Sequence, residues 1–123
     1  MQNLLHVPLY LGVQVTADFY GIPYAVLDNT DIIKQLMLQA AKEANTTIIN
    51  YYFHKFAPQG VSGAIIIAES HLSIHTWPEE GYAAIDIFTC GDKTKPYHAI
   101  EYLKDALKPT NIAITETQRG LLK

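Results

Sequence analysis

The chain has 123 residues, a formal charge of −3 at pH 7 and a single cysteine. This length is sufficient for one compact domain, and an apolar content of 49% provides enough side chains for a core. Nine Lys and Arg residues are too few for a concentrated nucleic-acid-binding surface, and no apolar run is long enough to span a membrane. A single Cys excludes an internal disulfide and fits the reducing cytoplasm.

The first part of the chain predicts a strand, a loop and a helix. The apolar amino-terminal segment lacks the basic region and the cleavage site of a signal peptide. Apolar side chains alternate over residues 12–20, which indicates a half-buried strand, and Gly, Pro and Asn predict a loop over residues 21–29. Residues 30–44 repeat apolar positions at helical spacing after an N-cap candidate, Thr30 or Asp31.

The middle of the chain predicts three strands. Residues 46–56 are β-branched and aromatic, which favours a strand. The apolar run at residues 64–70 predicts a buried strand, with a continuation through residues 71–75 left open. After a turn at residues 76–81, residues 82–90 predict a further strand.

Together with an amphipathic helix over residues 97–108 and a last strand over residues 111–117, the predicted order is β-α-β-β-β-α-β. This order indicates the α+β class, as a two-layer α/β sandwich with a mainly antiparallel sheet and two helices on one face. With no repeat, linker or low-complexity segment, residues 1–123 are expected to form a single domain. The other sheet face would need a partner, so we expect at least a homodimer.

Reactive side chains are densest in the stretch AESHLSIHTWPEEGYAAIDIFTCG, residues 68–91. Taken singly, they are typical of structural histidines, a buried cysteine and a solvated turn, and Ser70 lacks the flanking glycines of a hydrolase nucleophile. His71 and His75 are four residues apart, so they would share one face of a strand, and with Cys90 they could supply three zinc ligands. The spacing is not that of a known zinc finger and no second Cys follows, so no metal is expected.

A longer stretch, GVSGAIIIAESHLSIHTWPEEGYAAIDIFTCGD, resembles the signature of prokaryotic S-adenosylmethionine decarboxylase proenzymes almost residue for residue. The resemblance extends to FYG early in the chain, AAKEA at the helix end, FHKFAPQG, EYLK and the closing RG. It implies the fold of this family, and it implies an enzyme that makes its own cofactor.

Members of this family cut themselves at a Glu-Ser bond, which the resemblance places between Glu69 and Ser70. The Ser70 hydroxyl would attack the preceding carbonyl to convert the amide to an ester, and β-elimination would then leave a dehydroalanine that hydrolyses to a pyruvoyl group and ammonia. By the same resemblance, Ser62 assists ester formation and His75 promotes the elimination.

The resemblance implies two chains, a β chain of residues 1–69 and an α chain of residues 70–123 that begins with the pyruvoyl group. This carbonyl would form a Schiff base with the substrate amine and accept the electrons released with CO2. By resemblance, Cys90 is the proton donor that follows, and the product would serve as an aminopropyl donor in spermidine and polyamine biosynthesis.

Three further residues match the family's substrate-binding positions. Phe56 and Trp77 would sandwich the adenine of S-adenosylmethionine, drawing on apolar burial and cation–π attraction. Glu79 would bind the two ribose hydroxyls through its carboxylate oxygens.

Three positions depart from the family pattern: Gln14 replaces a His, Ile22 a Cys and Gln118 an acid. They leave the self-processing and decarboxylation residues intact, but they keep pyruvoyl-dependent arginine or ornithine decarboxylation open as an alternative. A second alternative is a non-catalytic binding or regulatory relative that never cleaves itself. The presence of Glu69, Ser70, His75 and Cys90 together favours an active enzyme.

Overall fold

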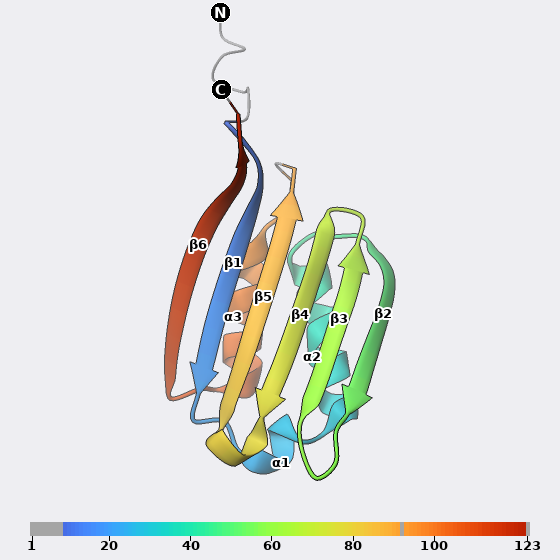
Figure 1. Ribbon diagram of the computed structural model, residues 1–123, viewed down its shortest axis with the longest axis vertical. Helices are drawn as coiled ribbons and strands as arrows, with labels where there is room; N and C mark the ends of the chain where they lie inside the picture. Colours follow the sequence, from blue (N-terminus) through green and yellow to red (C-terminus); the bar gives the residue numbers. More distant parts are fainter. Residues whose placement is uncertain (1–8, 92, 123) are drawn as a thin grey trace, which may run out of the picture.

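A six-stranded antiparallel sheet runs through the computed structural model, which describes residues 9–91 and 93–122 (Figure 1). Residues 1–8, Asp92 and Lys123 lie outside the described residues. The prediction that the amino-terminal segment is not a signal peptide falls largely on residues 1–8. The strand order is β2-β3-β4-β5-β1-β6. The strands are β1 (Tyr10–Tyr20), β2 (Ile48–Lys55), β3 (Val61–Ile67), β4 (Ser70–Trp77), β5 (Tyr82–Cys90) and β6 (Asn111–Leu121). The helices are α1 (Tyr24–Leu27), α2 (Thr30–Glu43), α3 (Pro96–Leu107) and the 3₁₀ helix η2 (Pro78–Glu80).

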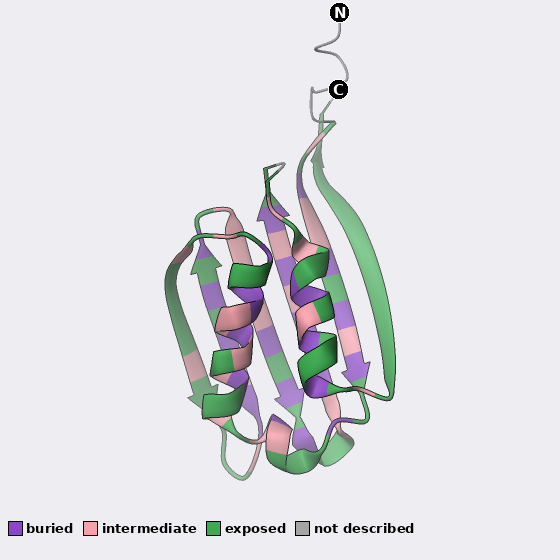
Figure 2. Cartoon of the chain, turned by 180° about the vertical axis from the view of Figure 1, so that it is seen from behind, coloured by how far each residue is buried: buried purple, intermediate pink, exposed green. Residues whose placement is uncertain are grey.

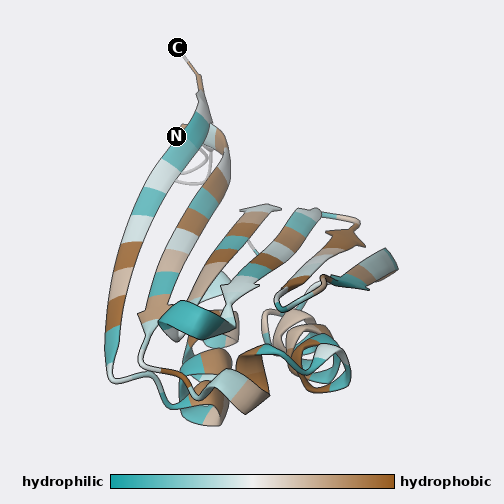
Figure 3. Ribbon diagram, turned by 60° about the horizontal axis from the view of Figure 1, so that its bottom comes forward, coloured by the Kyte–Doolittle hydropathy of each residue, from teal (hydrophilic) through white to brown (hydrophobic). Residues whose placement is uncertain are grey.

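Two long helices, α2 and α3, lie side by side on one face of the sheet, as the fold prediction required (Figures 2 and 3). Each helix turns one apolar stripe toward the sheet, because its apolar residues recur at helical spacing. The buried residues of these stripes are Ile33, Met37, Ala40 and Ala41 in α2, and Ala99, Ile100, Leu103 and Leu107 in α3. The two-layer α+β fold is therefore confirmed. No helix among the described residues is both long and apolar enough to cross a membrane.

The main error of the sequence prediction lies at residues 61–77, which form a hairpin of two strands, so that the sheet has six strands and not five. Buried positions fall on odd numbers along β3 and on even numbers along β4, and this change of phase marks a turn at Ala68 and Glu69. The turn contains no Gly, Pro or Asn, the residues that usually signal one.

Two local predictions are also corrected. The segment expected to be a loop contains the short helix α1. The N-cap of α2 is Asn29, whose Oδ1 accepts a hydrogen bond from the Ile32 N–H at 3.0 Å, and not Thr30 or Asp31. Asn29 has extended backbone angles, which allow its short side chain to reach back to the first turn.

The sheet face opposite the helices is uncovered. It carries polar and aromatic side chains, and not only the apolar side chains that the expected dimer contact suggested. In β4 this face carries His71, Ser73, His75 and Trp77, while the residues between them are buried against the helices. In β5 it includes Asp86, Phe88 and Cys90. The two histidines, Trp77 and Cys90 of the densest sequence stretch therefore share the uncovered face of the two central strands, whereas Ser70 is in phase with the buried positions of β4.

Candidate active site

The expected site residues fall into two groups, one beside each end of the β3–β4 hairpin. Ser62 lies opposite His75 across the hairpin, whereas Ser70 lies opposite Ile67 beside the turn. A strand rises about 3.3 Å per residue, so Ser70 and His75 are separated by roughly 17 Å along β4. The sequence resemblance grouped these residues in one reaction, but within one chain the structure keeps them apart.

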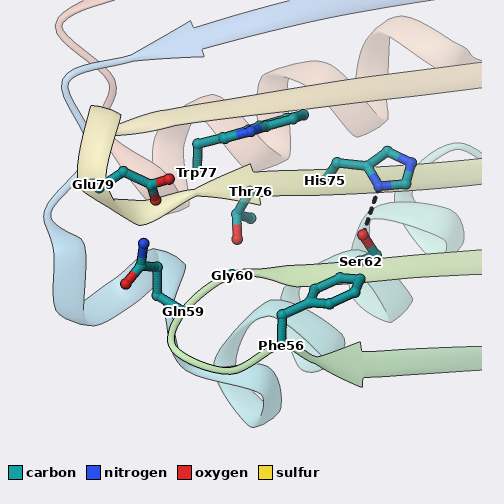
Figure 4. Close-up of a pocket in the computed structure, with 8 residues that line it drawn as sticks. All are labelled: Phe56, Gln59, Gly60, Ser62, His75, Thr76, Trp77 and Glu79. Atoms are coloured by element: carbon teal, nitrogen blue, oxygen red, sulfur yellow. Dashed lines mark hydrogen bonds between the residues drawn. The ribbon is translucent and has the colours of Figure 1, made fainter.

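The first group lines a cleft of about 380 Å³ at the end of the sheet where α1 and η2 lie (Figure 4). Its lining residues are Phe56, Gln59, Gly60, Ser62, His75, Thr76, Trp77 and Glu79. All three residues predicted to bind substrate are among them. Phe56 and Trp77 are 45% and 42% exposed, which is unusual for large aromatic side chains that serve only as core.

A hydrogen bond of 2.7 Å joins the Ser62 hydroxyl to Nδ1 of His75 inside this cleft (Figure 4). The pair is built by the antiparallel register, which sets the two residues directly opposite one another on the uncovered face. Ser62 thereby fixes the orientation of the imidazole, the side chain best suited to move a proton near neutral pH.

Trp77 is supported from behind by a row of aromatic rings. Its ring centroid lies 5.3 Å from that of Tyr82, which in turn stacks on Tyr20 at 5.2 Å. The Tyr82 hydroxyl donates a hydrogen bond of 2.6 Å to Asp18, and this bond raises the pKa of Tyr82 to about 12. Tyr82 is therefore a neutral hydrogen-bond donor at physiological pH, and its fixed ring leaves the other face of Trp77 available to a ligand.

The loop that carries Phe56 is tied to α1 through Asp28, which the sequence reasoning missed. Asp28 Oδ1 accepts a hydrogen bond from the Gly60 N–H at 2.9 Å and contacts Lys55 Nζ at 3.0 Å. The Gly60 bond, followed by the Lys55 bond, lowers the pKa of Asp28. Gly60 has φ of 111°, and a Cβ there would lie 3.3 Å from the Thr76 carbonyl, so this position favours glycine.

Three cleft residues, Gln59, Gly60 and Thr76, were not assigned from the sequence. Gln59 and Gly60 lie in the APQG segment that carried part of the family resemblance, so a signal for them was present. Thr76 is almost fully buried, and its hydroxyl donates to the Leu27 carbonyl while accepting from the Val61 N–H, both at 2.9 Å. It is therefore a structural link between strand and helix.

The second group consists of Glu69, Ser70 and Cys90 at the other end of the sheet. Ser70 begins β4 beside the last residues of β5, in register with Thr89. The Cys90 N–H donates a hydrogen bond of 3.0 Å to the Glu69 carbonyl, and the Cys90 thiol is free and exposed. The bond expected to be cut and the expected proton donor are therefore neighbours.

A polar network on the uncovered face involves Gln14, the first departure from the family pattern. Gln14 Nε2 donates to Asp86 Oδ1 at 2.9 Å, and the other Asp86 oxygen pairs with His71 Nε2 at 3.1 Å. Arg119 donates to Gln14 Oε1 and lies over the Phe88 ring at 5.6 Å. Gln14 thus bridges β1, β5 and β6, a role for which its side-chain amide offers both a donor and an acceptor.

The other two departures do not line the cleft. Ile22 is buried at 3% exposure, and its backbone N–H donates to the Gly81 carbonyl at 3.0 Å behind η2. Gln118 pairs with Val13 on the edge strand β6. Neither residue lines the cleft, so these departures do not alter the cleft directly.

The zinc interpretation finds no support in this arrangement. His71 pairs with Asp86 and His75 with Ser62. Within residues 9–91 and 93–122, no three His, Cys, Asp or Glu side chains lie close enough together to hold a metal ion.

Comparisons with known proteins agree with the resemblance. A family model described as S-adenosylmethionine decarboxylase matches residues 13–120. The chain is 52% identical over 110 residues to an S-adenosylmethionine decarboxylase proenzyme of Acidithiobacillus ferrooxidans, covering 89% of this chain and 83% of that protein. For the proenzyme of Thermotoga petrophila the identity is 53% over 110 residues, covering 89% and 85%.

A solved structure, that of the adenosylmethionine decarboxylase from Aquifex aeolicus, superposes with a TM-score of 0.88 at 39% identity. The superposition covers 94% of this chain and 96% of that one. The chain therefore belongs to the S-adenosylmethionine decarboxylase family.

Proposed function

We propose that this protein is a pyruvoyl-dependent S-adenosylmethionine decarboxylase, whose product is the aminopropyl donor for spermidine and polyamine biosynthesis. The observation that carries the proposal is the cleft of about 380 Å³ in which Phe56, Trp77 and Glu79 meet, a volume within the range of small-molecule sites. The exposed free thiol of Cys90, which this chemistry needs in reduced form, supports a cytoplasmic location.

The chain prepares its own prosthetic group by cutting between Glu69 and Ser70. The Ser70 oxygen forms a bond to the Glu69 carbonyl carbon, the C–N bond breaks, and the hydroxyl proton ends on the nitrogen. Removal of the Ser70 Cα proton then expels the Glu69 carboxylate, and hydrolysis of the resulting enamine releases ammonia. The products are a β chain of residues 1–69 and an α chain of residues 70–123.

When formed, the pyruvoyl group supplies a carbonyl that accepts the electrons released with CO2. The position of Cys90 beside Ser70 fits this group, because a proton must be delivered close to that carbonyl after CO2 has left. The Cys90 thiol is the proton donor, and its place on β5 directs the proton to one carbon.

The cleft binds the nucleoside. Phe56, Trp77 and Glu79 all line this cleft (Figure 4). Phe56 and Trp77 stack on the two faces of adenine, and Glu79 accepts hydrogen bonds from the ribose hydroxyls. Arginine or ornithine has no ring for such a sandwich, so the composition of the cleft favours S-adenosylmethionine over both.

Phe56→Ala is expected to raise the Kd for S-adenosylmethionine by an amount equivalent to about 1–3 kcal/mol, because one stacking face is lost. Tyr52→Ala, on the edge strand β2 that leads into Phe56 but outside the cleft, is the matched control and should bind normally. CO2 release from S-adenosylmethionine, arginine and ornithine should be measured side by side. Preference for an amino acid, or unchanged affinity in Phe56→Ala, would contradict the nucleoside assignment.

We propose further that the working form is a homodimer of processed protomers, packed through their uncovered sheet faces. His75, Trp77 and Cys90 lie on this face, and Ser70 is roughly 17 Å from His75 by strand rise. A two-fold axis perpendicular to the strands sets one end of a sheet opposite the other end of its copy. His75 of the partner subunit would then approach Ser70.

Co-expression of two defective variants tests this arrangement. His75→Ala keeps Ser70 but lacks the imidazole, and Ser70→Ala keeps the imidazole but has no hydroxyl to react. Each variant alone should stay uncut, and co-expression should give mixed dimers in which the His75→Ala chain is cut. Denatured mass identifies the cut chain by its substitution. If the His75→Ala chain stays intact in mixed dimers, His75 acts within its own chain and the proposed dimer is wrong.

A further inference from the structure

The turn that contains the cleavable bond is held from the side of β2. The Ala68 N–H donates to the Thr47 carbonyl at 2.8 Å, and the Thr47 N–H donates to Glu69 Oε1 at 3.1 Å. Thr47 directly precedes β2, so both of its backbone groups bind the turn. The Glu69 side chain takes the place of a backbone acceptor in this pairing.

The same turn is held from the opposite side by β5. The Cys90 N–H donates to the Glu69 carbonyl oxygen at 3.0 Å. Glu69 therefore has its side chain fixed toward one strand and its carbonyl fixed toward another, with β3 and β4 between them (Figure 1).

Ser70, the next residue, has φ of 143°, a conformation that L-residues rarely adopt. Such a conformation persists only where its surroundings hold it in place. The hydrogen bonds on Glu69 are the restraints immediately before the strained residue, and they hold Glu69 from the β2 side and from the β5 side.

We propose that Glu69 is a positioning residue for self-cleavage: its carboxylate, anchored on the Thr47 N–H, holds the scissile carbonyl against the Cys90 N–H and keeps Ser70 strained. This inference rests on the proposed function, because it concerns the reaction that makes the prosthetic group. It assigns to the Glu69 side chain a task before the cut, whereas its backbone carbonyl is the group attacked.

The hydrogen bonds favour the first chemical step. As the Ser70 oxygen bonds to the carbonyl carbon, the carbonyl oxygen gains negative charge, and the Cys90 N–H is already directed at it. When the C–N bond then breaks and the hydroxyl proton passes to the nitrogen, Ser70 no longer belongs to a planar amide. The strain at Ser70 is released in that step, so it accelerates ester formation.

The test compares Glu69→Met with Glu69→Gln, two side chains of similar length. The Gln oxygen still accepts a hydrogen bond from the Thr47 N–H, whereas Met provides no such acceptor. Proenzyme made by cell-free translation is followed by denatured mass over time. Glu69→Met should cut itself several-fold more slowly than Glu69→Gln, up to about tenfold, as expected for the loss of one hydrogen bond to a neutral acceptor. Equal rates in the two variants would overturn the inference.

Hydroxylamine identifies the step that is slowed, because it cleaves esters and leaves amides intact. The uncut Glu69→Met chain should resist it, whereas His75→Ala, blocked in the elimination, should accumulate an ester and be cut. An ester in Glu69→Met would place the defect after the first step and overturn the inference.

Thermal unfolding of Ser70→Ala chains carrying each Glu69 substitution separates positioning from stability, since neither chain can be cut. Equal midpoints together with different cutting rates support the positioning role, and a rate difference matched by lost stability overturns it. If the natural chain itself stays uncut, the proposed function fails; if it is cut and Glu69→Met is cut equally fast, the positioning role alone fails.

Discussion

The Ser70→Ala variant will remain one intact chain and will release no CO2 from S-adenosylmethionine. Alanine has no hydroxyl to attack the Glu69 carbonyl, so neither the ester nor the pyruvoyl group can form. The denatured mass of the purified variant should equal that of residues 1–123, whereas the natural chain should give two fragments that meet at Glu69 and Ser70. The α fragment should be blocked at its amino terminus, as a pyruvoyl group requires.

Ser73→Ala is the matched control for this experiment. Ser73 lies on the same strand and on the uncovered face, with no part in the proposed chemistry. It should be cut and active. A natural chain that stays intact after long incubation would instead favour the binding or regulatory relative, and decarboxylation by Ser70→Ala would exclude the pyruvoyl mechanism altogether.

Cys90→Ala is expected to cut itself and yet to lose turnover by a factor of about 10² or more, the usual contribution of a positioned acid. Processing survives because alanine keeps the backbone N–H that binds the Glu69 carbonyl. Turnover fails because no side-chain acid delivers the proton to the correct carbon. CO2 release over many cycles, compared with the natural enzyme, measures this loss.

The same variant should also inactivate itself during the residual turnover. A proton delivered to the wrong carbon transfers the substrate's amino group to the prosthetic group, which becomes an amino-terminal alanine. Edman sequencing of the α chain would detect this alanine, and it should increase with the number of turnovers. Durable turnover with no new amino terminus would remove Cys90 from its role.

The two long helices, α2 and α3, and most of the strands could be predicted from the sequence, because their signals are local. Ile33 and Met37 recur at helical spacing, and Val15, Ala17 and Phe19 alternate along β1. The β3–β4 turn could not be predicted in this way. Ala68 and Glu69 have no turn preference of their own, and contacts with Thr47 and Cys90, distant in sequence, hold them in place.

The candidate site was predictable in its residue types but not in its arrangement. The resemblance named Phe56, Trp77 and Glu79, and the structure brings all three together in one cleft. It also linked His75 to Ser70, which the hairpin register holds apart. The number of residues between two positions does not show how far apart they lie in the folded sheet. The separation of His75 from Ser70 therefore became clear only from the register of the strands.

The strand order has a consequence for the chain after it is cut. Residues 1–69 supply β1, β2 and β3, and residues 70–123 supply β4, β5 and β6. Because β1 lies between β5 and β6, the two fragments are interleaved: one cannot leave without breaking the ladders on both sides of β1 as well as that between β3 and β4. A protein cut as proposed would therefore hold together without a covalent link. Once unfolded, its two fragments would have to associate as separate molecules, so folding would have to precede the proposed cut, and refolding after it would be a bimolecular reaction.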